Sequence, residues 1–146
     1  MNLGILLRKP FQLLVEEIHG QLAQKGFPEI RPAHGVVFQF IGKQGARLTE
    51  LAARAQMAKQ SMSYLVEYLE KEGHVEKVAD ESDNRAKLFR LTSRGWKAVA
   101  VAEGAISSFE LKCKKKLGTT KYNQLLKLLK ELDEVLETTQ KPEDNR

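Results

Sequence analysis

A short stretch near the middle of the chain carries side chains that can hydrogen-bond to base edges and to phosphates. Six polar residues share one face of a helix expected over residues 59–72: Lys59, Gln60, Ser61, Ser63, Tyr64 and Glu67. Glutamine can pair bidentately with adenine, and lysine can reach guanine or a phosphate. This face therefore indicates a surface that could read DNA, and the alternative interpretation is an ordinary solvated helix face.

The helix that would carry these side chains is predicted from an apolar stripe. Four side chains recur at i, i+3, i+4, i+7, the spacing of one buried helix face: Met62, Leu65, Val66 and Leu69. Gly73 is expected to end this helix. A shorter helix is expected before it, with Thr49 as N-cap, because a threonine hydroxyl can accept a bond from N–H groups of the first turn.

A charged β-hairpin is expected next. The predicted strands, Val75–Val78 and Lys87–Leu91, flank the turn cluster Asp80-Glu81-Ser82-Asp83-Asn84. Arg85 is expected at the tip, where Asp83 either hydrogen-bonds to Arg85 or the turn backbone, or only forms the turn. Lys87 could add a phosphate contact. A helix pair followed by a hairpin predicts a mainly α fold with a small β wing, the winged helix-turn-helix, which places one helix in the major groove.

The rest of the chain is predicted to be helical. Helices are expected over residues 3–25, 32–41, 92–117 and 120–137. Pro10 either kinks the first of these or marks its first turn, and Gly26 is expected to end it. Phe38 and Trp96 are expected in the core. The last helix has a heptad-like leucine stripe of the kind that packs on a partner helix.

Composition excludes several kinds of site. The 146 residues suit one domain or a compact two-lobed subunit, and the net charge of +5 permits an anionic partner. No apolar run approaches the ~20 residues that span a bilayer, so no membrane segment is expected. No Gly-rich phosphate loop, nucleophile elbow or metal-ligand motif occurs. Neither an enzyme nor a cofactor or metal site is therefore predicted.

Several reactive or charged residues allow two interpretations. Cys113, the single cysteine, fits a reducing cytoplasm and is either a thiol activated by neighbouring lysines or a small buried side chain. Seven lysines lie between residues 112 and 130 without an acid among them. They form either a solvated face or a surface for a second anionic partner. The three histidines are scattered, which argues against a metal site.

Four short motifs, in this order, resemble those of the MarR family of bacterial transcriptional regulators. They are Leu48-Thr49-Glu50-Leu51-Ala52, Leu69-Glu70-Lys71-Glu72-Gly73, Asp83-Asn84-Arg85 and Leu91-Thr92-Ser93-Arg94-Gly95. Two helices before the module and two after it extend the resemblance over nearly the whole chain. Two positions depart from the family pattern: Ala58 stands where a capping Ser or Thr is common, and Tyr64 where Arg is common.

The resemblance implies a division of the single subunit, residues 1–146, into lobes. Residues 31–95 would form the winged DNA-binding lobe, residues 1–30 and 96–139 the dimerisation lobe, and residues 140–146 a frayed tail. It also implies a cytoplasmic homodimer that binds a palindromic operator in double-stranded DNA, usually as a repressor. Release from the operator is commonly triggered by a small aromatic or phenolic acid, or by oxidation of a cysteine that is usually near the N-terminus.

The resemblance also implies roles for individual residues. Major-groove contacts would come from the helix residues Lys59, Gln60, Ser61, Ser63 and Tyr64. Arg85 would enter the minor groove, whose negative potential attracts arginine, with Asp83 and Lys87 beside it. An effector pocket would form between the lobes, near His19, His34 and Phe38. The alternative interpretation of each histidine is a partly buried side chain with its hydrogen bonds satisfied.

A different interpretation is a protein that has lost operator binding and acts through protein contacts. From Lys43 to Gly95 there are ten basic and eight acidic residues, a weak surplus for a DNA-binding module. Ala58, which cannot cap the recognition helix, points the same way. Gln60, Asp83 and Arg85 argue for DNA.

Overall fold

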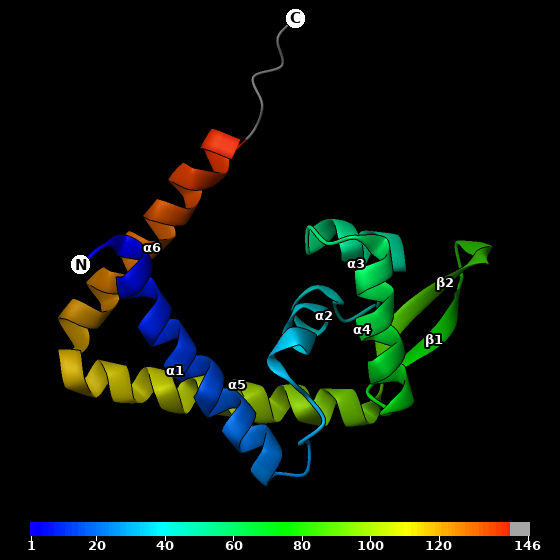
Figure 1. Cartoon of the computed structure of the whole chain (residues 1–146), viewed down its shortest axis with the longest axis horizontal. Helices are drawn as coiled ribbons and strands as arrows, with labels where there is room; N and C mark the ends of the chain where they lie inside the picture. Colours follow the sequence, from blue (N-terminus) through cyan, green and yellow to red (C-terminus); the bar gives the residue numbers. More distant parts are fainter. Residues whose placement is uncertain (141–146) are drawn as a thin grey trace, which may run out of the picture. The chain divides into compact units, whose positions relative to one another are not determined.

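The computed structural model describes residues 1–140 and is mainly helical with one β-hairpin (Figure 1). In chain order the elements are α1 (Leu3–Gln24), the 3-10 helix η1 (Pro32–His34), α2 (Gly35–Phe40), α3 (Leu48–Arg54), α4 (Lys59–Lys71), β1 (Val75–Asp80), β2 (Asp83–Leu91), α5 (Ser93–Leu117) and α6 (Thr119–Gln140). This confirms the predicted winged helix-turn-helix class. The predicted tail, residues 140–146, lies outside the described residues except for Gln140.

The chain divides into two compact units, and the boundary falls inside α5. The larger unit is Met1–Ile106, and the second begins at Ser107. The larger unit contains α1 to β2 and the first half of α5. The candidate site described below lies entirely within it.

The first helix begins earlier than Pro10 and runs through it. The Asn2 side chain accepts a hydrogen bond from the Ile5 backbone N–H at 3.0 Å and caps the helix. The interpretation that the helix starts at Pro10 is therefore wrong. Gly26 follows the C-cap with φ +97°, a conformation that costs glycine little, and the predicted end of the helix is confirmed.

One apolar cluster joins α2, α3, α4 and the hairpin. α4 contributes its predicted stripe: Met62, Val66 and Leu69 are fully buried, and Leu65 packs against them. The facing residues are Val37, Ile41, Ala46, Leu51, Ala52, Val75, Phe89 and Leu91. A second cluster, formed by Leu22, Phe27, Ile30 and Ala98, joins the end of α1 to α5. The first cluster holds α4 against the base of the hairpin, and the second holds α1 against α5.

The hairpin is longer than the sequence predicts. Its antiparallel pairs run from Val75↔Leu91 to Ala79↔Lys87, and a further pair joins Asp80 to Asp83. Residues 84–86 of β2 have no partner in this register and form a bulge. Only Glu81 and Ser82 remain in the turn, so Arg85 lies in β2 and not in the turn itself.

Two glycines allow close approaches around the hairpin. Ala46 exchanges two backbone hydrogen bonds of 2.9 Å with Phe89. The preceding Gly45 has φ +83°, and a Cβ there would lie 2.5 Å from the Phe89 carbonyl oxygen. At the start of α5, a Cβ on Gly95 would collide with the His74 carbonyl oxygen. A side chain at either position would push these elements apart.

Two sequence predictions about helix starts and core aromatics fail. The N-cap of α3 is Arg47, not Thr49, because Arg47 is extended and its backbone N–H bonds back to the Glu50 carboxylate at 3.4 Å. Trp96, in the first turn of α5, is 41% exposed and not in the core. Phe38 is half-buried and packs against both apolar clusters, as expected.

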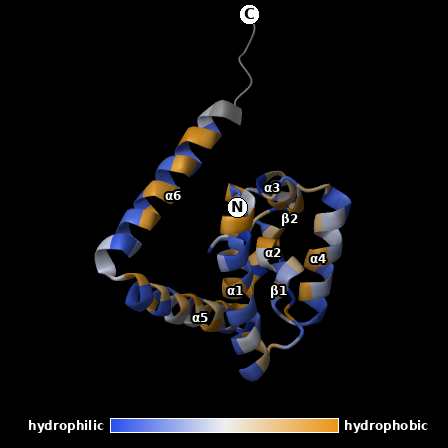
Figure 2. Cartoon of the chain, turned by 60° about the vertical axis from the view of Figure 1, so that its left-hand side comes forward, coloured by the Kyte–Doolittle hydropathy of each residue, from blue (hydrophilic) through white to orange (hydrophobic). Residues whose placement is uncertain are grey.

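The second unit contains the end of α5 and α6. Figure 2 shows apolar residues in orange recurring along α6. Of its described side chains only Tyr122 is buried. Six large apolar side chains of α6 are exposed: Leu125, Leu126, Leu128, Leu129, Val135 and Leu136. This helix therefore has an apolar face that the single chain leaves uncovered.

Candidate nucleic-acid interface and adjoining cavity

The connection between α3 and α4 sets the start of the helix that carries the candidate DNA-reading residues. Gln56 adopts φ +53°, and the Met57 N–H then bonds to the Ala52 carbonyl at 2.9 Å. Ala58 is extended and makes no side-chain cap. N–H groups of the first turn of α4 therefore have no side-chain acceptor at the cap position.

The predicted reading face of α4 is on the surface. Lys59, Gln60, Ser61 and Tyr64 are exposed, and Tyr64 is 75% exposed. A buried stripe on the opposite side anchors the helix. The structure thus brings these four residues together on one open surface.

Ser63 and Glu67 form a pair on the same helix. Ser63 is half-buried, and its hydroxyl donates to the Glu67 carboxylate at 3.1 Å. Glu67 itself is exposed. Because that hydroxyl proton is already used, Ser63 is less available to DNA than its four neighbours.

The wing presents Arg85 from the bulge in β2. Asp83 Oδ1 accepts the Arg85 backbone N–H at 3.0 Å, as the sequence predicts, and this bond shapes the bulge. Arg85 and Lys87 are both exposed. Side chains along a regular strand alternate between its two faces, and the unpaired residues interrupt this alternation. The bulge therefore sets the direction in which the Arg85 side chain projects.

A carboxylate at the end of β1, beside the turn of the wing, has both oxygens hydrogen-bonded, and no sequence pattern predicts its partner Arg47. Asp80 Oδ2 accepts from Arg47 Nε at 2.9 Å and from a terminal guanidinium nitrogen at 2.6 Å. Asp80 Oδ1 accepts from the Ser82 N–H at 3.0 Å and its hydroxyl at 2.7 Å. The Ser82 hydroxyl and the Arg47 guanidinium lower the pKa of Asp80 to about 2. This Asp80 network ties the wing to the residue that precedes α3.

A second polar group lies inside the larger unit. The Glu29 carboxylate accepts from Arg94, and it lies 2.8 Å from Nε2 of the fully buried His74. Nε2 must carry a proton to bond to a carboxylate, and Nδ1 has no partner among the described residues. Burial raises the pKa of Glu29, but its hydrogen bonds to the backbone, His74 and Arg94 outweigh burial and lower it.

Tyr68 joins α4 to the segment that precedes α2. Its hydroxyl donates to the Glu29 carbonyl oxygen at 2.9 Å. Its ring stacks on His34, with centroids 4.5 Å apart and planes 5° apart. His34 Nδ1 accepts the Arg31 N–H at 2.8 Å. Burial lowers the pKa of His34, which favours the neutral ring in this stack.

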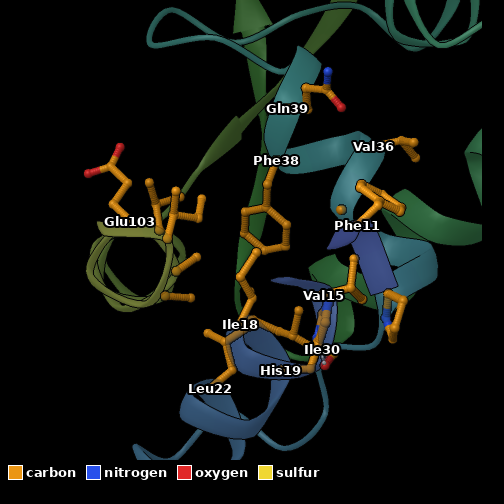
Figure 3. Close-up of a pocket in the computed structure, with 16 residues that line it drawn as sticks. Phe11, Val15, Ile18, His19, Leu22, Ile30, Val36, Phe38, Gln39 and Glu103 are labelled. Atoms are coloured by element: carbon orange, nitrogen blue, oxygen red, sulfur yellow. Dashed lines mark hydrogen bonds between the residues drawn. The ribbon is translucent and has the colours of Figure 1, made fainter. Parts of the chain in front are cut away.

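A partly open cavity of about 580 Å³ lies between α1, the η1–α2 segment and α5 (Figure 3). Its wall is mostly apolar and consists of Phe11, Val15, Ile18, His19, Leu22, Ile30, Pro32, Gly35, Val36, Phe38, Gln39, Ala98, Val99, Ala102, Glu103 and Ile106. His19 and Phe38 are in the wall, as expected for the effector pocket. His34 is not, because it is buried against Tyr68.

A shallower hollow lies at the start of α4. It is lined by Ala33, Val36, Met57, Ala58, Gln60, Ser61, Tyr64 and Leu65. Val36 thus lines both the hollow and the inner cavity. One α2 side chain separates the candidate reading face from the cavity.

Among the described residues, no group of three or more histidine, cysteine, aspartate or glutamate side chains is placed to hold a metal ion. Within the same residues, no helix is long and apolar enough to cross a membrane.

Comparisons with known proteins find transcriptional regulators. A model of the MarR family matches residues 30–86. The HTH-type transcriptional regulator BilQ of Clostridioides difficile (strain CD3) is 24% identical over 126 residues, 84% of this chain and 80% of that protein. The structure of transcriptional regulator Tm0710 from Thermotoga maritima is 28% identical with a TM-score of 0.64, over 93% of this chain and 94% of that chain.

A structure with bound DNA has the same fold. The S. aureus MepR–DNA complex superposes with a TM-score of 0.71 at 19% identity, over 92% of this chain and 98% of that chain. The family match covers most of the winged module, and the relative and the structures extend the likeness over most of the chain. The chain therefore resembles transcriptional regulators of the MarR family, through the match at residues 30–86 and through its winged helix-turn-helix fold.

Proposed function

We propose that this regulator binds a palindromic operator as a homodimer, represses transcription there, and leaves the operator when a small molecule fills the cavity. The carrying observation is the exposed polar face of α4 together with the exposed Arg85 of the wing. Buried apolar residues anchor α4, and the Asp80 network anchors the wing. Both elements are thus held in place before any DNA is bound.

In the proposed complex, the first turns of α4 enter the major groove. Gln60 pairs with an adenine edge, and Lys59 reaches a guanine or a phosphate. Ser61 and Tyr64 bond phosphates or bases. Because Ala58 makes no cap, first-turn N–H groups are available to a phosphate oxygen. Ser63 takes part only by giving up its bond to Glu67.

The wing supplies the minor-groove contact. Arg85 enters a narrow A·T-rich groove, where the negative potential is strongest. Asp83 holds the backbone of the bulge from which Arg85 projects, and Lys87 contacts a phosphate. The weak positive surplus of the module makes these placed contacts more important than overall charge.

A second copy of the chain would cover the apolar faces of α1 and α6. On α1, the exposed apolar side chains are Leu3, Ile5, Leu6, Leu7, Phe11 and Leu13. Exposed apolar side chains gathered on one element mark interaction surfaces. Residues 1–30 and 96–139 would therefore form the dimerisation lobe, and residues 31–95 the DNA-binding lobe. The dimer would place two recognition helices about 34 Å apart, one turn of DNA.

The segment from Glu29 to Val36 would carry the signal from the cavity to α4. Ile30, Pro32 and Val36 line the cavity. Glu29 and His34, on the same segment, contact Tyr68 of α4 through a hydrogen bond and a ring stack. A ligand that displaces the cavity wall would therefore displace Tyr68 and the recognition helix with it.

Selection of genomic fragments on the purified protein tests the proposal. We expect an enriched palindrome with half-sites about 10 bp apart, bound by a dimer. The fragment, placed upstream of a reporter, should lower expression when the regulator is present. A selection that enriches no sequence would contradict operator binding, and raised expression would contradict repression.

A second candidate function is regulation through protein contacts without DNA. It is favoured by the exposed Glu67 on the reading face and by the small charge surplus of the module. The same selection separates the two functions. An absence of enriched fragments, in a protein shown to be a folded dimer, would favour the second.

A further inference from the structure

The described cavity wall has few polar side chains, and none of them is a lysine or an arginine. Only His19, Gln39 and Glu103 are polar among the described lining residues, and none of that lining is lysine or arginine. His19 Nδ1 lies 3.1 Å from the Ile30 carbonyl oxygen, which can only accept a hydrogen bond. Nδ1 is therefore the protonated ring nitrogen in the neutral ring, and Nε2 is an acceptor.

This lining discriminates between ligand charges. An ion that moves from water into an apolar cavity must find an opposite charge or lose much of its solvation energy. Glu103 supplies the one carboxylate in the described wall of the cavity. A carboxylate ligand would meet a like charge and an imidazole acceptor. An ammonium group would meet an opposite charge.

Glu103 is placed at the edge of the cavity. Figure 3 shows it projecting from α5 on the side away from Ile18 and Leu22, and it is exposed. A ligand with one charged end would therefore put that end near solvent at Glu103 and its apolar body against Phe38 and Ile18. The volume of about 580 Å³ suits a small organic molecule.

We propose that the cavity binds a hydrophobic amine in its protonated form, with Glu103 as the counter-ion. The proposal rests on the proposed function in taking this cavity as the effector site. It replaces the aromatic acid that the family resemblance implies. The described wall has no lysine or arginine to pair with an acid, and its one carboxylate is complementary to an amine.

Three probes of one shape test the ligand class: 2-naphthylmethylamine, 2-naphthalenemethanol and 2-naphthoic acid. Calorimetric titration of the full chain at pH 7 should rank the amine first and the acid last. Because Glu103 is exposed, the amine should exceed the alcohol by about twofold to fivefold. Tightest binding by the acid, or no binding of any probe, would overturn the proposal.

Three variants test whether Glu103 causes the preference for the amine and whether the probes bind in the cavity. Glu103→Gln should remove the preference of the amine over the alcohol without changing the affinity of the alcohol. The matched control Glu110→Gln removes the same charge two turns further along α5, outside the cavity wall, and should keep the preference. An unchanged preference in Glu103→Gln would overturn the role of Glu103. Ala102→Trp, folded by circular dichroism, should weaken all three probes, and unchanged binding would place the site elsewhere and overturn the proposal.

DNA binding by the same samples separates this inference from the proposed function. If the amine binds with dependence on Glu103 and releases the operator fragment, both stand. If it binds in that way but leaves the DNA complex intact, the ligand class stands and the effector role of the cavity fails. If the acid binds tightest in the cavity and releases the DNA, the effector role stands and the amine inference fails.

Discussion

α4 and the wing are held in the same unit by different interactions. α4 buries Met62, Val66 and Leu69 completely, in a cluster shared with α2, α3 and the hairpin. The wing beyond Ala79 depends on hydrogen bonds to the Asp80 carboxylate and on one bond of Asp83. Apolar burial is spread over many atoms and is independent of pH, whereas a carboxylate network depends on a few groups and on ionisation. Loss of the α4 structure should therefore require a substitution in its apolar core. A single polar substitution should be enough to disturb the conformation of the wing.

The largest expected effect is on the core side of α4. Met62→Ala removes a fully buried side chain and should lower the free energy of unfolding by about 2–5 kcal/mol, measured by urea denaturation. Gln60→Ala on the opposite face should change it by no more than about 0.5 kcal/mol while weakening DNA binding. Equal losses of stability in the two variants would contradict the assignment of the two faces.

The wing should respond in the opposite way. Asp80→Asn removes the charge that holds Arg47 and should reduce operator affinity by roughly tenfold, the effect of one misplaced DNA contact. The melting temperature should change far less than in Met62→Ala. Glu81→Gln, a neutralised neighbour in the turn, is the control and should bind at least as tightly as the original protein. Unchanged affinity in Asp80→Asn would show that this network does not position the wing.

The Asp80 network should also respond to acid. The folded pKa of about 2 lies below the ordinary value of 3.8, so this carboxylate stabilises the wing fully above pH 3.8, and the contribution is lost as the pH falls towards 2. Nuclear magnetic resonance should therefore show the Ser82 amide titrating with a midpoint near pH 2, and no such step in Asp80→Asn. A midpoint near pH 4 would mean that the network is not formed in solution.

A smaller effect is expected at the turn between α3 and α4. Gln56 is the one described non-glycine residue with positive φ, at +53°. Gln56→Gly should raise the free energy of unfolding by up to about 1 kcal/mol, because glycine adopts this conformation without steric cost. Thermal denaturation gives the measurement, and Gln44→Gly in the loop before α3 is the comparison. A lower melting temperature for Gln56→Gly would contradict the strain.

Sequence reasoning found the elements whose residues are close along the chain. The stripe of α4 was predictable because burial imposes a period of 3.6 residues, and its predicted end at residue 72 lies one residue beyond Lys71. The Asp83–Arg85 bond was predictable because it joins residues two apart. The bulge was not predictable, because no local pattern marks where β2 loses its register. The sequence therefore predicts Arg85 in the turn, whereas the structure has it in β2.

Contacts between residues that are far apart in the sequence could not be predicted, for a different reason. Arg47 meets Asp80 across 33 positions, and His34 meets Tyr68 across 34. Nothing in the spacing of the chain marks either pair. Of the two interpretations of His34, the structure supports the partly buried side chain with satisfied hydrogen bonds, and its partner Tyr68 could not be predicted. For Asp80 the sequence predicts only a place in the turn cluster. The cap of α3 was assigned to Thr49 because residue type favoured it, while the backbone of Arg47 and the reach of Glu50 decided the outcome.

The most direct test of DNA reading by α4 and the wing is the affinity of Arg85→Ala for the selected operator fragment. Fluorescence anisotropy at fixed salt should show complete loss of specific binding, with the dimer intact by light scattering. Lys25→Ala, which removes one exposed charge after α1, should bind like the original protein. Unchanged affinity in Arg85→Ala, or equal losses in both variants, would contradict the account.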